Sequence, residues 1–454
     1  MSVAPKDVFG HGTEEDLTLE HLGYQQGILA MGSANNSFAA NFILGQANLV
    51  NPEYVIERWH TVLVTYAVAI WALVVNTFMP HLLNRLSRAI LLWNVCSFII
   101  IVVVLLATNK DKQDAAFVFQ DFQNTTGFGS AMATMVGILQ SFFGMCCYDT
   151  PSHMTEEMTH ASRDAPKAMV MSVGMGAVTG FIFLLTLCFC IGDIDATANS
   201  STGVPVLQIF YDSTQSKVGA CFMTSLMTVI MMVASVSLVA EGSRALFAFA
   251  RDRGMPFSGI LSRVEKRRKI PIYAILFTVV VQMAFNSIYF GTVTGFNTVV
   301  SIATTGFCKT FPSGTWTNNG TNSVTLLDVS YALVLLARLL GYTFGHDIAP
   351  VDGPYSFPLP ISLGLHGLGF LFLFFAFITF NFPSDAPVTP DSMNYTSAAI
   401  GLIALLSIFT WFTTARKQFK GPADVQGLVV DGVEQIQEAG EGSARCSEKL
   451  KSDT

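Results

Sequence analysis

The chain has 454 residues, of which 51% are hydrophobic and only 13% are charged. A soluble domain carries about 25% charged residues, so this composition excludes an ordinary soluble protein and indicates a chain whose solvent is lipid. The net charge of -7 gives no indication of a nucleic-acid partner. Most of the eight cysteines lie in or beside apolar runs without a C-x-x-C pair, which predicts packing residues and no disulfide framework.

About ten apolar segments follow a polar stretch at residues 1–26, which has no apolar core of a cleavable signal peptide. Most hold about 18–23 residues, enough for a helix to cross a hydrocarbon core of about 30 Å. They are expected to be helices, because an open strand in lipid leaves backbone groups unpaired. The segments are 27–49, 61–79, 88–107, 131–148, 168–191, 218–240, 272–290, 296–341 (interrupted), 361–382 and 395–413.

The sequence therefore predicts an all-α integral membrane protein with three parts. These are a cytoplasmic tail at 1–26, a transmembrane domain at 27–414 and a disordered cytoplasmic tail at 415–454, rich in Gly, Glu and Ser. The first apolar segment is the weakest of the ten, because polar residues interrupt it. They are Asn35, Asn36, Asn41, Gln46 and Asn48.

The basic stretch at 241–271 sets the expected orientation. It lies between two spans and holds eight Lys and Arg residues against three acidic ones, which is the pattern of a cytoplasmic loop. Alternation of the spans then puts both termini in the cytoplasm. The glycosylation sequons at Asn124, Asn199 and Asn394 fall in or beside the longest loops expected outside.

The segment 139–168 is the candidate binding site. An apolar helix there meets Gly144 and then a Cys-Cys-Tyr-Asp run before Thr150-Pro151, which disfavours a continuous helix. A helix broken at membrane depth exposes N–H and C=O groups that can hold a substrate or a coupling ion. The alternative is that the helix simply ends at Tyr148, with Asp149 at the interface.

Two other charged groups have local explanations. His153, Glu157 and His160 share one helical face, a spacing that could hold a metal, but a solvated face of a cytoplasmic helix explains it equally well. Glu241 ends a span near the cytoplasmic edge, where pairing with Arg244 is the favoured interpretation. Without catalytic or nucleotide-binding motifs, the sequence predicts no enzyme, no cofactor and no metal.

Four motifs resemble those of the fungal amino acid–polyamine–organocation (APC) permeases, with the GABA, choline and biotin-precursor permeases most similar. They are EDLTLEHLGYQQ (15–26), NPEYVIERWHTVL (51–63), HMTEEMTHASRDAPKAM (153–169) and SRALFAFARDRGMPFS (243–258). The resemblance covers roughly residues 13–420. It implies an inverted-repeat bundle of the APC/LeuT type, with twelve helices, that carries a small amine or amino acid by symport or exchange.

The broken sixth helix of that family maps onto eight residues here, and the resemblance implies that they bind substrate. They are Phe142, Phe143, Gly144, Met145, Cys146, Cys147, Tyr148 and Asp149. Among them, the aromatic Phe142, Phe143 and Tyr148 are expected to gate the path or stack on an ammonium group. Polar residues of the 27–49 and 218–240 spans are expected to line the same path.

The chain departs from the family pattern twice. The first two of the usual twelve helices are missing, with the join near Gln26–Gly27, which removes half of the expected central site. A polar stretch at 305–328 interrupts the tenth span, where a retained intron or gene-model error is favoured over a real loop insertion.

We therefore expect a secondary active permease for amino acids, GABA, choline or polyamines, embedded in the plasma membrane and coupled to a proton or counter-solute gradient. The alternative is a truncated, non-transporting isoform or a membrane nutrient sensor. An intramembrane enzyme has little support.

Overall fold

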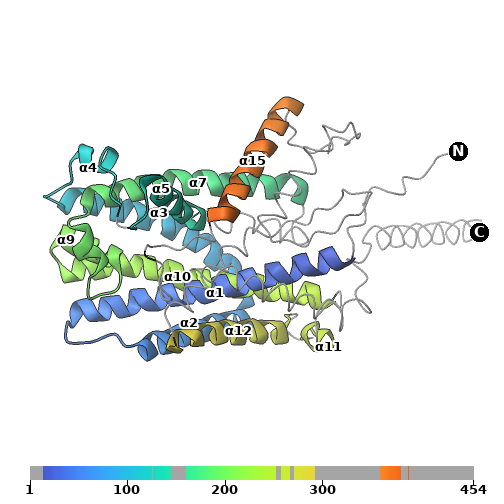
Figure 1. Ribbon diagram of the computed structural model, residues 1–454. Helices are drawn as coiled ribbons and strands as arrows, with labels where there is room; N and C mark the ends of the chain where they lie inside the picture. The colour runs from blue at the N-terminus through green and yellow to red at the C-terminus, as the bar shows by residue number, and fades with distance from the viewer. Residues whose placement is uncertain are drawn as a thin grey trace, which may run out of the picture.

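A computed structural model describes residues 14–124, 126–144, 160–251, 257–265, 270–291, 358–379 and 387 of the chain. Within these ranges every regular element is a helix. Figure 1 shows the long helices lying side by side along one direction, with α15 crossing them at a steep angle. The all-α membrane bundle predicted from the sequence is confirmed.

Among the described residues, five helices are long and apolar enough to cross a membrane: α2 (Arg58–Phe78), α3 (Leu83–Thr108), α7 (Ala161–Cys190), α10 (Lys217–Arg251) and α12 (Ile272–Gly291). Three more, α1 (Glu14–Val50), α5 (Ser130–Gly144) and α15 (Leu359–Thr379), coincide with further predicted segments. The predicted segments 296–341 and 395–413, the stretch 305–328 and the tail 415–454 lie outside the described residues.

Short helices gather at the two ends of the bundle. At one end, named here the cap end, lie α4 (Ala115–Phe119), α8 (Ile194–Ala198) and α9 (Pro205–Thr214). The opposite end, named the basic end, holds α11 (Ser258–Leu261) and the 3-10 turn η1 (Pro80–Leu82) before α3. Both loops that carry the described sequons, at Asn124 and Asn199, belong to the cap end.

Hydrogen bonds tie the cap end together. The Asn109 Nδ2 donates to the Cys190 carbonyl at 3.1 Å and to the Ser213 Oγ at 3.2 Å, which joins the ends of α3, α7 and α9. The Lys217 Nζ donates to the Val50 carbonyl at 3.4 Å and joins the end of α1 to the start of α10. Helices α1, α3 and α7 therefore all end at the cap end, where α10 begins.

Two helix boundaries differ from the sequence-based expectation. Helix α1 is continuous across the tail boundary and the join expected at 26–27. The sequence predicted a basic loop at 241–271, but helix α10 continues to Arg251. The prediction was therefore wrong for residues 241–251, which are helical. The reason is local: Leu246, Phe249 and Ala250 recur at helical spacing and are buried against neighbouring helices, which keeps the backbone helical.

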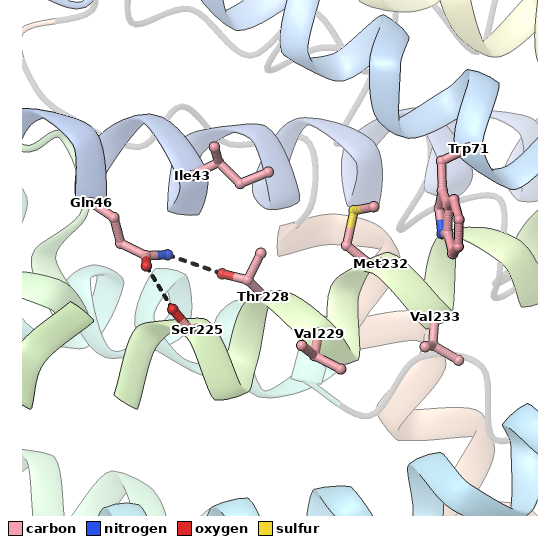
Figure 2. A pocket seen from close by; sticks show the side chains of 8 residues that line it. All are labelled: Ile43, Gln46, Trp71, Ser225, Thr228, Val229, Met232 and Val233. Atoms are coloured by element: carbon pink, nitrogen blue, oxygen red, sulfur yellow. Dashed lines mark hydrogen bonds between the residues drawn. The ribbon is translucent and has the colours of Figure 1, made fainter. Parts of the chain in front are cut away.

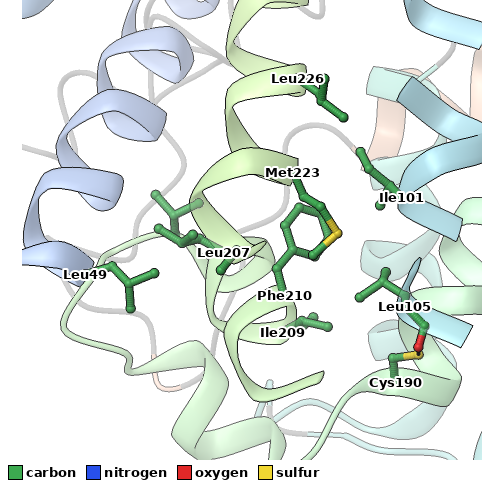
Figure 3. Packing of buried hydrophobic residues seen from close by; sticks show 11 residues of the cluster. Leu49, Ile101, Leu105, Cys190, Leu207, Ile209, Phe210, Met223 and Leu226 are labelled. Atoms are coloured by element: carbon green, nitrogen blue, oxygen red, sulfur yellow. Dashed lines mark hydrogen bonds between the residues drawn. The ribbon is translucent and has the colours of Figure 1, made fainter. Parts of the chain in front are cut away.

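The packed centre consists of α1, α2, α10 and α12, which contact one another in every pairing. Small residues allow this close approach: a Cβ at Gly242 on α10 would lie 2.9 Å from the Ile28 Cγ2 on α1. Near the cap end, Phe210 of α9 is fully buried between Leu49 on the α1 side and Leu105 on the α3 side (Figure 3). Helices α3 and α7 keep most of their apolar side chains exposed, as lipid-facing helices do.

Candidate functional site

A buried polar seam joins α1 to α10 and α12. The Ser33 and Ser37 hydroxyls both donate to the Asn286 Oδ1, at 2.8 and 2.9 Å. The Asn36 Nδ2 donates to the Gln282 Oε1 at 3.3 Å, and the Ser235 hydroxyl donates to the Asn36 Oδ1. Polar side chains in a bilayer are costly unless they are paired. The seam therefore explains why the first predicted span is so polar.

Not every donor of the seam is satisfied. The Thr278 Oγ1, Gln282 Nε2 and Asn286 Nδ2 are buried, and none has a hydrogen-bond partner among the described residues. These three side chains are spaced four residues apart along α12, so they share one face of that helix. The α12 face toward α1 is thus a strip of polar groups inside the bundle.

A groove of about 440 Å³, named here the first groove, opens between α1, α2 and α10. Its polar rim is one connected group: the Gln46 Nε2 donates to the Thr228 Oγ1 at 3.2 Å, and the Ser225 hydroxyl donates to the Gln46 Oε1 at 2.8 Å. Figure 2 shows this rim at one end of the groove and Trp71 with Val233 at the other. The lining residues are Ile43, Gln46, Trp71, Ser225, Thr228, Val229, Met232 and Val233.

The chemistry of the first groove suits a small amphipathic cation. No charged side chain is among its lining residues, which leaves lone pairs on hydroxyl and amide oxygens as the polar contacts. Trp71 is 44% exposed, and the face of an exposed indole attracts an ammonium group. A volume of 440 Å³ lies within the usual range for small-molecule sites.

Comparison with known proteins identifies the family. A family model described as amino acid permease matches residues 27–406. The chain belongs to the amino acid permease family. It is therefore a multi-pass membrane transporter for amino acids or related amines, and not an enzyme, as the sequence predicted.

Individual relatives agree with this assignment. The permease is 55% identical over 378 residues to a Macrophomina phaseolina protein described as an amino acid/polyamine transporter, covering 82% of this chain and 78% of the relative. It is 27% identical to a Saccharomyces cerevisiae choline transporter, covering 87% of this chain and 66% of that protein. It is also 27% identical to a rice amino-acid permease BAT1 homolog, covering 82% of this chain and 67% of the relative. The permease thus spans about two thirds of the length of the two more distant relatives.

The site predicted from the sequence falls only partly within the described residues. Phe142, Phe143 and Gly144 belong to the last described turn of α5, which packs against α15. Met145, Cys146, Cys147, Tyr148 and Asp149 lie outside the described residues, as do His153 and Glu157 of the possible metal face. His160 precedes the first residue of α7. The predicted substrate site therefore stays a prediction.

The first groove contains residues from two spans that the sequence predicted to line a path, and one residue, Trp71, that it did not single out. Polar residues of the 27–49 and 218–240 spans were expected along the path, and Gln46, Ser225 and Thr228 come from those spans. Trp71 was missed, because a tryptophan inside an apolar run carries no signal of which face of the helix meets a groove. Only the packing of α2 beside α10 brings this indole to the groove.

Proposed function

We propose that the permease binds a small amine or amino acid in the first groove and carries it across the plasma membrane by alternating access. The single observation that carries this proposal is the joint presence of an oxygen-rich rim and an exposed indole in one groove of suitable size. Of the cargo expected from the sequence, GABA and polyamines present an ammonium group with N–H donors, and choline presents a quaternary ammonium with a hydroxyl donor.

The rim offers acceptors rather than donors to such a group. Both hydrogens of the Gln46 amide are already used, on the Phe42 carbonyl at 3.1 Å and on the Thr228 Oγ1. The Thr228 hydroxyl in turn donates to the Thr224 carbonyl at 2.9 Å. What remains toward the groove is lone pairs on the Gln46 Oε1, the Ser225 Oγ and the Thr228 Oγ1. An ammonium group can donate to them while its alkyl part contacts Val229 and Met232.

The helix break expected at Gly144–Asp149 is proposed to supply the opposite wall of the path. Free backbone carbonyls at such a break would hold an ammonium, and free N–H groups would hold a carboxylate. Movement of that wall against the packed group of α1, α2, α10 and α12 would alternate access between the two sides. A proton or counter-solute gradient is the proposed driving force.

The distribution of charge supports cytoplasmic termini. Arg85 and Arg88 lie at the start of α3, and Arg251 at the end of α10, so all three belong to the basic end. Asn124 and Asn199, which would receive glycans outside, belong to the cap end. Since cytoplasmic loops carry the excess of Lys and Arg, the basic end is proposed to face the cytoplasm and the cap end the outside.

The test is uptake of radiolabelled GABA, choline, putrescine and amino acids by a permease-deficient host that expresses the full chain at its surface. The test variant is Gln46→Leu, which removes the rim acceptor at similar volume, and it is compared with the parent chain. Saturable uptake that the variant weakens supports the proposal. Surface delivery and ligand binding without any uptake would refute it and would favour the non-transporting isoform or sensor.

A further inference from the structure

A second groove, of about 300 Å³, opens between α3 and α10. Ser87 and Asn94 of α3 and Ser237 of α10 give it a polar edge, and Ile230 and Ala234 give it an apolar floor. Ser87 lies one turn after the start of α3, so this groove belongs to the basic end. The first groove, by contrast, begins at Gln46, one turn before the cap end of α1.

One residue lines both grooves: Val233 of α10. With roughly 3.6 residues per turn, the two sets of lining residues fall on adjacent faces of α10, and Val233 lies between them. From Ser225 in the first groove to Ser237 in the second, α10 rises about 18 Å. A small amine is shorter than that, so it cannot contact both polar edges at once.

We propose that the two grooves are the two halves of one substrate path along α10, and that Val233 is the apolar constriction between them. This inference rests on the proposed function and adds the position of the barrier. On each side of Val233 an ammonium group meets oxygen acceptors. These are Gln46 and Ser225 in the first groove, toward the cap end, and Ser87 and Asn94 in the second groove, toward the basic end.

At the constriction itself, acceptors are scarce. The side chain of Val233 has none, and the Val233 carbonyl already accepts the Ser237 hydroxyl at 3.3 Å. An ammonium group that passes this point loses its hydrogen bonds, which is unfavourable in an apolar environment. The Trp71 indole, which lies at the same end of the first groove as Val233 (Figure 2), offers a compensating contact there through its π face. The barrier therefore opposes leakage when no conformational change accompanies passage.

The first experiment measures access to the two grooves without reference to transport. Thr228→Cys and Ser237→Cys are placed separately in a background whose native cysteines are replaced and which still reaches the cell surface. A membrane-impermeant thiol reagent is then added from outside. We expect labelling at position 228 in intact cells and labelling at position 237 only after permeabilisation. Adding Val233→Ala should raise the outside labelling rate at position 237 at least tenfold.

Equal outside labelling of the two positions in the chain with Val233, or no effect of Val233→Ala, would overturn the inference. Uptake provides the second measurement. Val233→Trp should lower it at least tenfold while outside labelling at position 228 persists, which shows that the variant is folded. The matched control is Val178→Trp on α7, at a side chain that is 61% exposed and lines neither groove. If labelling follows the expectation but no amine is taken up, the constriction stands and the proposed cargo fails.

Discussion

A single methyl group added at Gly32 on α1 should lower the stability of the permease. A Cβ at Gly32 would lie 2.1 Å from the Gln282 Nε2 and 2.7 Å from the Gln282 Cδ. Gln282 is fully buried, so its amide cannot move aside into solvent. The Gly32→Ala variant must therefore displace the amide and break the hydrogen bond between Asn36 and Gln282.

The expected magnitude follows from three effects. Overpacking in a close-packed interior costs about 1–3 kcal/mol. Loss of the Asn36–Gln282 hydrogen bond costs about 0.5–1.5 kcal/mol. Alanine is more favourable than glycine within a helix by about 1 kcal/mol, which offsets part of the loss. We expect Gly32→Ala to lower the free energy of unfolding by about 1–3 kcal/mol.

The measurement is the unfolding temperature of the purified permease in detergent, followed by size-exclusion chromatography after heating. Gly174→Ala on α7 is the matched control, because a Cβ there meets no atom within 4 Å. This control should leave the unfolding temperature unchanged or raise it. In the Gln282→Ala background, Gly32→Ala should cost much less stability than it costs in the parent, because the clashing amide is gone. If Gly32→Ala is as stable as the parent, or if it costs as much stability with Gln282→Ala as without it, Gly32 does not pack against the Gln282 amide.

Three further predictions concern the core and the first groove. Phe210→Ala should lower the free energy of unfolding by about 3–5 kcal/mol, since Phe210 is fully buried, whereas Phe222→Ala, at a side chain that is 56% exposed, should change the unfolding temperature little. Gln46→Ala should raise the KM for uptake of an ammonium substrate about tenfold, because the substrate loses roughly one charge-assisted hydrogen bond. The control, Gln208→Ala on α9, should leave the KM unchanged. Trp71→Phe should retain choline uptake and Trp71→Ala should raise its KM by about fivefold to tenfold, because only the first keeps an aromatic face.

The helices were predictable where a segment is uniformly apolar. The predicted segment 272–290 ends within one residue of α12 (Ile272–Gly291). The predicted segment 61–79 agrees with α2 (Arg58–Phe78) within three residues at each end. The reason is that a bilayer selects for length and hydropathy, and both are local properties of a sequence. The end of α10 was missed because buried Leu246 and Phe249 keep the helix going past the basic Arg244.

The polar seam could not be predicted from local sequence patterns. Asn36 weakens the prediction of a first span, because an isolated amide in lipid is unfavourable. Its partner, Gln282, is 246 residues away in the sequence, and no local pattern connects the two. Only the packing of α1 against α12 shows that the amide is paired. The same limit applies to the first groove, whose lining residues come from three separate helices.

Uncharged polar side chains thus have two different roles in this permease, in the seam and at the first groove. Their hydrogen bonds distinguish the two roles. Within the seam, Ser33, Ser37 and Asn36 are buried and bonded to α12, so they hold the helices together. At the groove, Gln46 and Ser225 are bonded to each other and still keep lone pairs toward open space. Removing a seam residue should therefore lower stability before it alters transport. Removing a groove residue should alter the KM first, because no buried partner is left unpaired. Measuring both quantities on both classes of variant distinguishes a scaffold contact from a substrate contact on α1.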